Sequence, residues 1–165
     1  MNNDNGACGA TVTYSVTFAD NCTGASMNQT AGQASGTLFP IGATLNTFVV
    51  TDGSSNTATC SFTVTVTDAE LPVITCPSDI TQDTDANSCD AVVNFTAPTG
   101  TDNCPGATTV LGAGGLASGS TFPLGATTNT YTVTDASGNE ASCTFTVTIE
   151  DNDCLLYTSD AADEE

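Results

Sequence analysis

One stretch of the chain decides the fold: residues 143–150 read Cys-Thr-Phe-Thr-Val-Thr-Ile-Glu. The apolar side chains of Phe145, Val147 and Ile149 alternate with Thr and Glu. Successive side chains of a β-strand point to opposite faces, so an apolar period of two predicts a strand with one buried face. A strand of this kind needs a second layer to cover its apolar side.

An earlier stretch carries the same pattern and reveals an internal repeat. Residues 60–67 read Cys-Ser-Phe-Thr-Val-Thr-Val-Thr, 83 positions before the first stretch. At that offset, residues 34–68 and 117–151 agree at 22 of 35 positions. Further upstream, Cys8 corresponds to Cys89 and Cys22 to Cys104, with small slips. A repeat of this length is a domain and not one turn of a solenoid.

Each repeat contains further short strands separated by turns. Alternation over Val93, Phe95 and Ala97 predicts another strand, matched by Val12, Tyr14 and Val16. The pair Tyr131 and Val133 predicts a third, matched by Phe48 and Val50. Turn signals lie between them at residues 102–103, 122–125 and 137–139. This pattern predicts an all-β chain of tandem immunoglobulin-like antiparallel β-sandwiches.

The charge of the chain excludes several classes of partner. The sequence has 165 residues with 19 Asp and Glu and no Lys, Arg or His. A nucleic-acid surface needs basic side chains, so no nucleic-acid partner is expected. No apolar run approaches the length of a membrane span, so no membrane insertion is expected. Such an acidic chain favours cations and a salty exterior.

The eight cysteines indicate disulfides. Zinc sites made of cysteine alone usually contain Cys-x-x-Cys pairs, and none occurs here. Disulfides persist in oxidising compartments, which predicts a secreted or cell-surface protein. Cysteines used in this way, together with the absence of His and Lys, remove the usual bases and nucleophiles, so we expect no enzyme.

The second repeat resembles the hyalin repeat, or HYR module. The resemblance rests on Leu-Pro-Val-Ile-Thr-Cys-Pro at 71–77, Cys-Asp-Ala-Val-Val at 89–93 and Thr-Asp-Asn-Cys at 101–104. It continues through Phe-Pro-Leu-Gly at 122–125 and residues 131–135 and 137–145. The first repeat matches only from Cys8 onward and lacks a counterpart of Cys76-Pro77. The family implies an immunoglobulin-like fold, an extracellular location and a role in cell adhesion.

Strand order and the resemblance together suggest a disulfide pairing. The first and last strands of such a sandwich lie side by side, so we expect Cys76 to bond with Cys143; two-cysteine members of the family imply the same pair. That leaves Cys89 for Cys104 and, by analogy, Cys8 for Cys22. Cys60 then has no partner, because its mate would precede residue 1.

We expect three segments along the chain. Residues 1–68 form an N-terminally truncated HYR-like module, and residues 69–153 form a complete one. Residues 154–165 resemble the translation of a sequencing-library adapter, which predicts a non-native tail; a short natural tail is the alternative.

Recurring acidic residues suggest a calcium site. Asp20 and Asp102 share an Asp-Asn-Cys turn, Asp52 and Asp135 both end a Thr-Asp strand, and Asp68 and Asp151 end the repeats. Calcium takes six to eight oxygen ligands. Because the exit of one module adjoins the entry of the next, candidate ligands are Asp68, Glu70, Asp102 and Asp135. The alternative is that each acid only stabilises its own turn. No other cofactor is expected.

These observations favour a structural function. We expect an extracellular spacer or adhesion array whose partners are neighbouring repeats and an extracellular protein or glycan. An accessory ligand- or carbohydrate-binding module of a larger secreted hydrolase is the alternative. Sugar platforms usually use aromatic rings, whereas Tyr14 and Tyr131 fit inward strand positions and no Trp is present. The Thr rows at 63–67 and 144–148 fit the solvent face of strands better than a mineral- or ice-binding surface.

Overall fold

The computed structural model describes residues 1–152, and all their regular structure is β-strand. The first repeat contributes β1 (Gly9–Val12), β2 (Ser26–Ala31), β3 (Thr37–Pro40), β4 (Gly42–Thr51) and β5 (Thr57–Val66). The second contributes β6 (Ile80–Asp83), β7 (Asp90–Val93), β8 (Thr108–Leu111), β9 (Ser120–Pro123), β10 (Gly125–Thr134) and β11 (Glu140–Glu150). The predicted all-β class is confirmed. Within this range no helix is long and apolar enough to cross a membrane. The predicted adapter-like tail lies outside the described residues.

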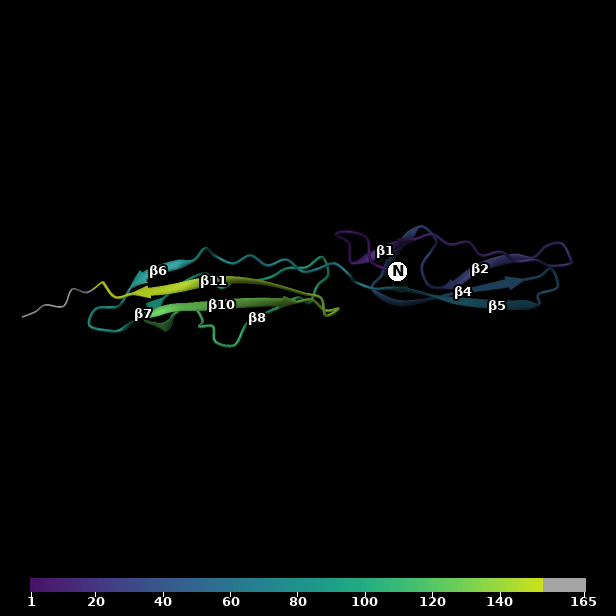
Figure 1. Cartoon of the computed structure of the whole chain (residues 1–165). Helices are drawn as coiled ribbons and strands as arrows, with labels where there is room; N and C mark the ends of the chain where they lie inside the picture. The colour runs from purple at the N-terminus through teal and green to yellow at the C-terminus, as the bar shows by residue number, and fades with distance from the viewer. Residues whose placement is uncertain (153–165) are drawn as a thin grey trace, which may run out of the picture. The chain divides into compact units, whose positions relative to one another are not determined.

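The chain divides into two compact units, labelled by strand in Figure 1. Unit 1 contains residues 1–73 together with the segments 100–108 and 133–141. Unit 2 contains residues 74–99 and 109–132 and continues from residue 142. The units therefore differ from the sequence repeats, because residues 69–73 and the segments 100–108 and 133–141 of the second repeat belong to unit 1.

Unit 2 is built around a sandwich of two sheets. One sheet has the strand order β6-β11-β10-β8, and β7 pairs with β9 in the other. The enclosed core contains Phe122 from β9, Tyr131 from β10 and Phe145, Val147 and Ile149 from β11. The alternation predicted for residues 143–150 is thus confirmed on β11. The sheets are not purely antiparallel, since β6 runs parallel to β11.

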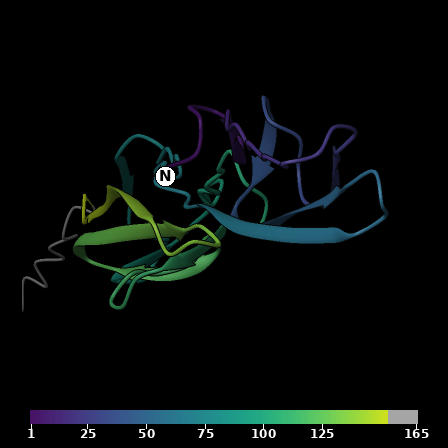
Figure 2. The ribbon, with the colours of Figure 1, turned by 90° about the vertical axis from the view of Figure 1, so that its right-hand side faces the viewer.

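Unit 1 repeats this design with a smaller core. Its sheets have the orders β2-β4-β5 and β1-β3, and the long β4–β5 hairpin can be followed in Figure 2. One core cluster of unit 1 contains the buried residues Ala10, Phe39 and Val66. Where β6 lies beside β11 in unit 2, the described chain has only an isolated parallel bridge from Asn2 to Thr67. Phe62 of β5 is accordingly only partly buried, whereas its repeat counterpart Phe145 is buried.

The strands predicted over Val12–Val16 and Val93–Ala97 end earlier than expected. Strand pairing stops at Val12 and at Val93. Beyond these points, the backbone N–H of Tyr14 donates to Ser35 Oγ at 2.9 Å, and that of Phe95 donates to Ser118 Oγ at 2.8 Å. A serine hydroxyl thus replaces the next ladder hydrogen bond at the same place in both repeats.

Both repeats also share a buried asparagine that the sequence pattern did not predict. Asn46 and Asn129, 83 positions apart, are fully buried on β4 and β10. Asn129 Oδ1 accepts a hydrogen bond from the backbone N–H of Leu116 at 2.7 Å, and Asn46 Oδ1 accepts one from Gln33 at 2.9 Å. Each amide therefore holds a crossing loop against its sheet.

We expect Asn129→Ala to lower the free energy of unfolding by about 1–3 kcal/mol, because the buried N–H of Leu116 would lose its acceptor. Thr128→Ala, at the exposed neighbouring position, is the matched control and should change stability by less than about 0.5 kcal/mol. Urea denaturation followed by far-UV circular dichroism measures both. Equal effects of the two substitutions would show that the buried hydrogen bond contributes nothing particular.

Candidate functional site

A tight turn at residues 102–104 organises the candidate site. Asp102 Oδ2 accepts a hydrogen bond from the backbone N–H of Cys104 at 2.9 Å, closing an Asx turn. Asn103 Nδ2 donates to the carbonyl of Ala7 at 3.0 Å. The turn is therefore fixed against the chain just before β1, and all of these residues belong to unit 1.

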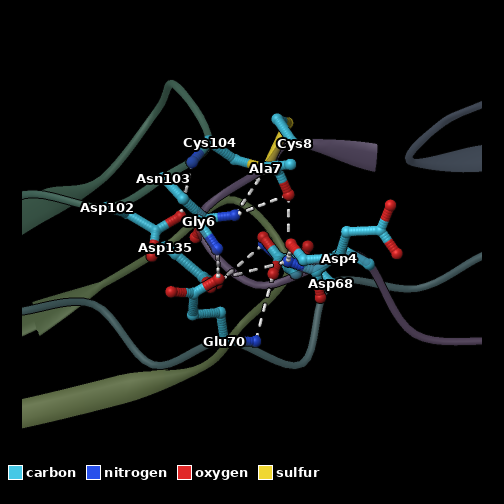
Figure 3. The surroundings of a disulfide bond; sticks show 12 residues. Asp4, Gly6, Ala7, Cys8, Asp68, Glu70, Asp102, Asn103, Cys104 and Asp135 are labelled. Atoms are coloured by element: carbon cyan, nitrogen blue, oxygen red, sulfur yellow. Dashed lines mark hydrogen bonds between the residues drawn. A yellow bond between two sulfur atoms is a disulfide. The ribbon is translucent and has the colours of Figure 1, made fainter. Parts of the chain in front are cut away.

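A disulfide between Cys8 and Cys104 secures the same contact (Figure 3). The structure thus differs from the expected pairing of Cys8 with Cys22 and of Cys89 with Cys104. The hydrogen bond from Asn103 to the carbonyl of the neighbouring residue Ala7 explains the difference, because it places Cys104 beside Cys8. The Cα atoms of these two cysteines are 4.9 Å apart. Cys22 and Cys89 are exposed free thiols.

The second described disulfide joins Cys76 to Cys143. This is the pair that strand order suggested, and its two half-cystines pack against the core of unit 2. Cys60, the repeat counterpart of Cys143, is a free and exposed thiol.

Three buried oxygen atoms near the disulfide accept no hydrogen bond from any residue in the range 1–152. They are Asp68 Oδ2, Asp102 Oδ1 and Asn103 Oδ1. Asp68 is 3% exposed, and its other oxygen accepts the backbone N–H of Glu70 at 3.2 Å. Oxygen atoms of Asp68 and Asp102 lie within 4.8 Å of each other and of Cys104 Sγ. Buried carboxylate oxygens without donors are costly, because burial removes the water that would solvate them.

Asp135, the third acid predicted for the site, uses its oxygens inside its own turn. Oδ1 accepts the backbone N–H groups of Ser137 and Asn139, both at 2.8 Å, and Oδ2 accepts Asn139 Nδ2 at 2.8 Å. Burial raises the pKa of Asp135, but these hydrogen bonds outweigh it and hold the pKa below the ordinary value. Asn139 Nδ2 also donates to the carbonyl of Asp68 at 3.2 Å.

Glu70, the fourth predicted acid, contacts the segment before β1. Its Oε2 accepts the backbone N–H of Gly6 at 2.8 Å. Asn3 Nδ2 lies at 3.5 Å from the same oxygen. Glu70 therefore positions residues 3–8 beside the turn of Asp102 (Figure 3).

Asp52 forms the loop equivalent to that of Asp135 in the first repeat. Its Oδ2 accepts Asn56 Nδ2 at 2.8 Å, and its Oδ1 accepts the backbone N–H groups of Asn56 and Ser54. The hydrogen bonds from Asn56 lower the pKa of Asp52. A lowered pKa means that this loop is stabilised while Asp52 is ionised, and that the contribution is lost as pH falls through the folded pKa.

The site can hold a hard cation but offers no reacting group. Two carboxylates and an amide carbonyl supply only oxygen donors, which suit calcium or magnesium. Cys104 is oxidised and presents no thiolate. The sequence has no Lys, Arg or His whose side chain could neutralise Asp68 and Asp102.

Sequence reasoning omitted Asn103 as a candidate ligand and Ala7 as its anchor. The available signal for Asn103 was its place in the repeated Asp-Asn-Cys turn, where the amide can donate and accept at once. No sequence signal identified Ala7, because its carbonyl is 96 residues away along the chain.

Comparison with known families decides the membership of the chain. The model of the HYR domain matches residues 3–66 and again residues 67–149. The chain belongs to the HYR domain family. The predicted resemblance is therefore confirmed, and the match extends over both repeats.

Curated relatives include hyalins of two sea urchins. Hyalin of Strongylocentrotus purpuratus is 40% identical over 131 residues, covering 77% of this chain and 11% of the relative. Hyalin of Lytechinus variegatus is 34% identical over 151 residues, covering 90% and 28%. A serine-rich adhesin for platelets from Staphylococcus aureus is 32% identical over 153 residues, covering 86% and 11%. The HYR chain thus spans a small part of each of these relatives.

Among solved structures, the chain is similar to extracellular domains of protocadherins. Human mucin-like protocadherin EC1-2 has a TM-score of 0.35 at 16% identity, with 78% of this chain and 85% of that chain covered. Protocadherin gamma B2 domains 1–5 give 0.36 at 14% identity, with 79% and 34% covered. The all-β class rests on the strands of this chain.

Proposed function

We propose that this HYR chain is an extracellular, non-catalytic structural module of an adhesion or spacer array. The observation that carries the proposal is the match of the HYR domain to two consecutive repeats. Relatives named hyalin and serine-rich adhesin support it, because both contain stretches similar to most of this chain.

The covalent design of the module supports an extracellular location. Disulfides persist in oxidising compartments, and two occur among the described residues. The absence of His and Lys supports a non-catalytic role, since His is the side chain used most often as a general base. A structural module needs surface and stiffness instead, and short strands closed by disulfides provide both.

Adhesion is tested with beads that carry the purified chain. The beads flow over surfaces coated with extracellular matrix proteins or with glycans, and retention under shear is counted. We expect oxidised chain to retain beads well above beads coated with albumin. Chain that has been reduced and alkylated is the matched control and should lose that retention, because its fold is no longer cross-linked. Retention of oxidised chain equal to albumin on every surface would contradict the adhesion function.

A further inference from the structure

We propose that unit 1 binds one calcium ion through Asp68 Oδ2, Asp102 Oδ1 and Asn103 Oδ1. These oxygens are buried and accept no hydrogen bond within residues 1–152. Asp68 is only 3% exposed. A carboxylate oxygen that is buried without a hydrogen-bond donor is costly, and a bound cation would offset that cost. The sequence provides no basic side chain for that purpose.

The donor set selects calcium by its chemistry. Two carboxylates and one amide carbonyl are hard oxygen ligands, and calcium accepts them at 2.3–2.6 Å. Oxygens that share one such ion lie up to about 5 Å apart, which agrees with the 4.8 Å limit on the group containing Asp68 and Asp102. Magnesium needs near-ideal octahedral geometry, which three ligands held by turns do not readily supply. Water completes the coordination.

The surrounding hydrogen bonds hold each ligand with one oxygen left over. The backbone N–H of Glu70 donates a hydrogen bond to Asp68 Oδ1, and that of Cys104 donates one to Asp102 Oδ2. The second oxygen of each carboxylate is left available. The side-chain Nδ2 of Asn103 donates a hydrogen bond to the carbonyl oxygen of Ala7, which leaves the side-chain carbonyl Oδ1 available as a ligand. The Cys8–Cys104 disulfide fixes the turn that carries two of the three ligands.

The repeat supplies matched control positions. Asp20 occupies the place of Asp102 in the first repeat, and Asp151 occupies the place of Asp68 in the second. Both controls are exposed. Asp20→Asn and Asp151→Asn remove the same charge as Asp102→Asn and Asp68→Asn, so they separate binding at the site from general screening of the net charge of −19.

Calorimetric titration of the full oxidised chain with calcium chloride, at ionic strength fixed with sodium chloride, tests the proposal. We expect one saturable site with a dissociation constant of about 0.1–1 mM, the range of extracellular calcium modules. Asp68→Asn and Asp102→Asn should each weaken binding about tenfold or more, whereas Asp20→Asn and Asp151→Asn should leave it unchanged. Magnesium should bind more weakly than calcium.

Thermal unfolding gives an independent readout. Calcium at ten times the dissociation constant should raise the midpoint by about 5 °C in the native chain and not in Asp68→Asn. Without calcium, Asp68→Asn should unfold no earlier than the native chain, because it removes a buried charge; a merely structural Asp68 would unfold earlier. The absence of saturable binding, or equal losses in Asp20→Asn and Asp102→Asn, would overturn the site. Adhesion plays no part in either measurement, so a failed adhesion assay leaves this result standing.

Discussion

Reduction of the two disulfides is expected to lengthen the fully stretched chain by about 370 Å. The bridges from Cys8 to Cys104 and from Cys76 to Cys143 overlap along the sequence. A taut oxidised chain therefore runs from Cys8 across to Cys104, back to Cys76 and across to Cys143. Only about 28 residues stretch on that route, against about 135 in the reduced chain, and each residue adds at most about 3.5 Å.

Single-molecule force spectroscopy measures this difference, with handles at the two ends of the chain and with or without a reductant. The two loops enclose 96 and 67 residues, but they overlap. The stretch from Cys76 to Cys104 therefore stays on the taut path, and the pair hides about 107 residues, more than either loop alone and fewer than the two loops added together. An overlapping pair suits a spacer, because force along the chain meets a covalent path before the modules have extended far.

The same measurement distinguishes this pairing from the one suggested by the family resemblance. Bonds from Cys8 to Cys22 and from Cys76 to Cys143 would hide about 81 residues, so reduction would add about 280 Å. Cys8→Ser is the matched control. It leaves only the Cys76–Cys143 bridge, whose 67-residue separation gives a gain of about 235 Å on reduction. A gain of about 280 Å in the native chain would refute the Cys8–Cys104 bond.

Much of the fold could be predicted because it is written in local patterns. The alternation on residues 143–150 predicted β11 and its inward residues Phe145, Val147 and Ile149, and these are buried. The repeat then assigned an equivalent strand at β5. The pattern failed beyond Val12 and Val93, where a serine from a distant loop takes the hydrogen bond and ends the strand. A hydroxyl that reaches across the fold has no local signature.

Asn46 and Asn129 show a second limit of pattern reasoning. They occupy inward strand positions, yet polar residues count against burial in an apolar period. Their burial depends on a loop N–H that arrives from 13 residues away. The shared Gly-to-Asn contact, Gly32 with Asn46 and Gly115 with Asn129, leaves no room for a Cβ on the loop. Only the folded loop makes this requirement visible.

The sequence suggested the acids of the candidate site but not their bonding. Recurring acids pointed to Asp68, Asp102 and Asp135, and the expected exit of the first module added Glu70. Their hydrogen bonds separate them into two pairs. Asp135 and Glu70 already accept backbone N–H groups, whereas Asp68 and Asp102 each keep an oxygen without a donor. The disulfide from Cys8 to Cys104 depends on a contact 96 residues apart in sequence, which no spacing rule predicts.

Phe122→Ala is expected to lower the free energy of unfolding of unit 2 by about 3–5 kcal/mol, because a large buried ring would leave a cavity. Phe122 is 0% exposed and lies opposite Ala91 in the β7–β9 pair, so a small residue already sits across from it. Because its side chain is so small, Ala91 on the neighbouring strand cannot fill the cavity by changing its rotamer. A domain with about 5–15 kcal/mol of stability would lose a large part of it.

Chemical denaturation of the oxidised chain, followed by circular dichroism, measures the loss. Phe39→Ala is the matched substitution in unit 1, where Phe39 is also 0% exposed and pairs with Ala10. Phe18→Ala is the control, because Phe18 is 45% exposed and its removal should cost less than about 1 kcal/mol. A loss below 1 kcal/mol for Phe122→Ala would mean that the two sheets do not close on this ring. The sandwich assigned to unit 2 would then be wrong, since Phe122 is the largest side chain that β9 contributes to its core.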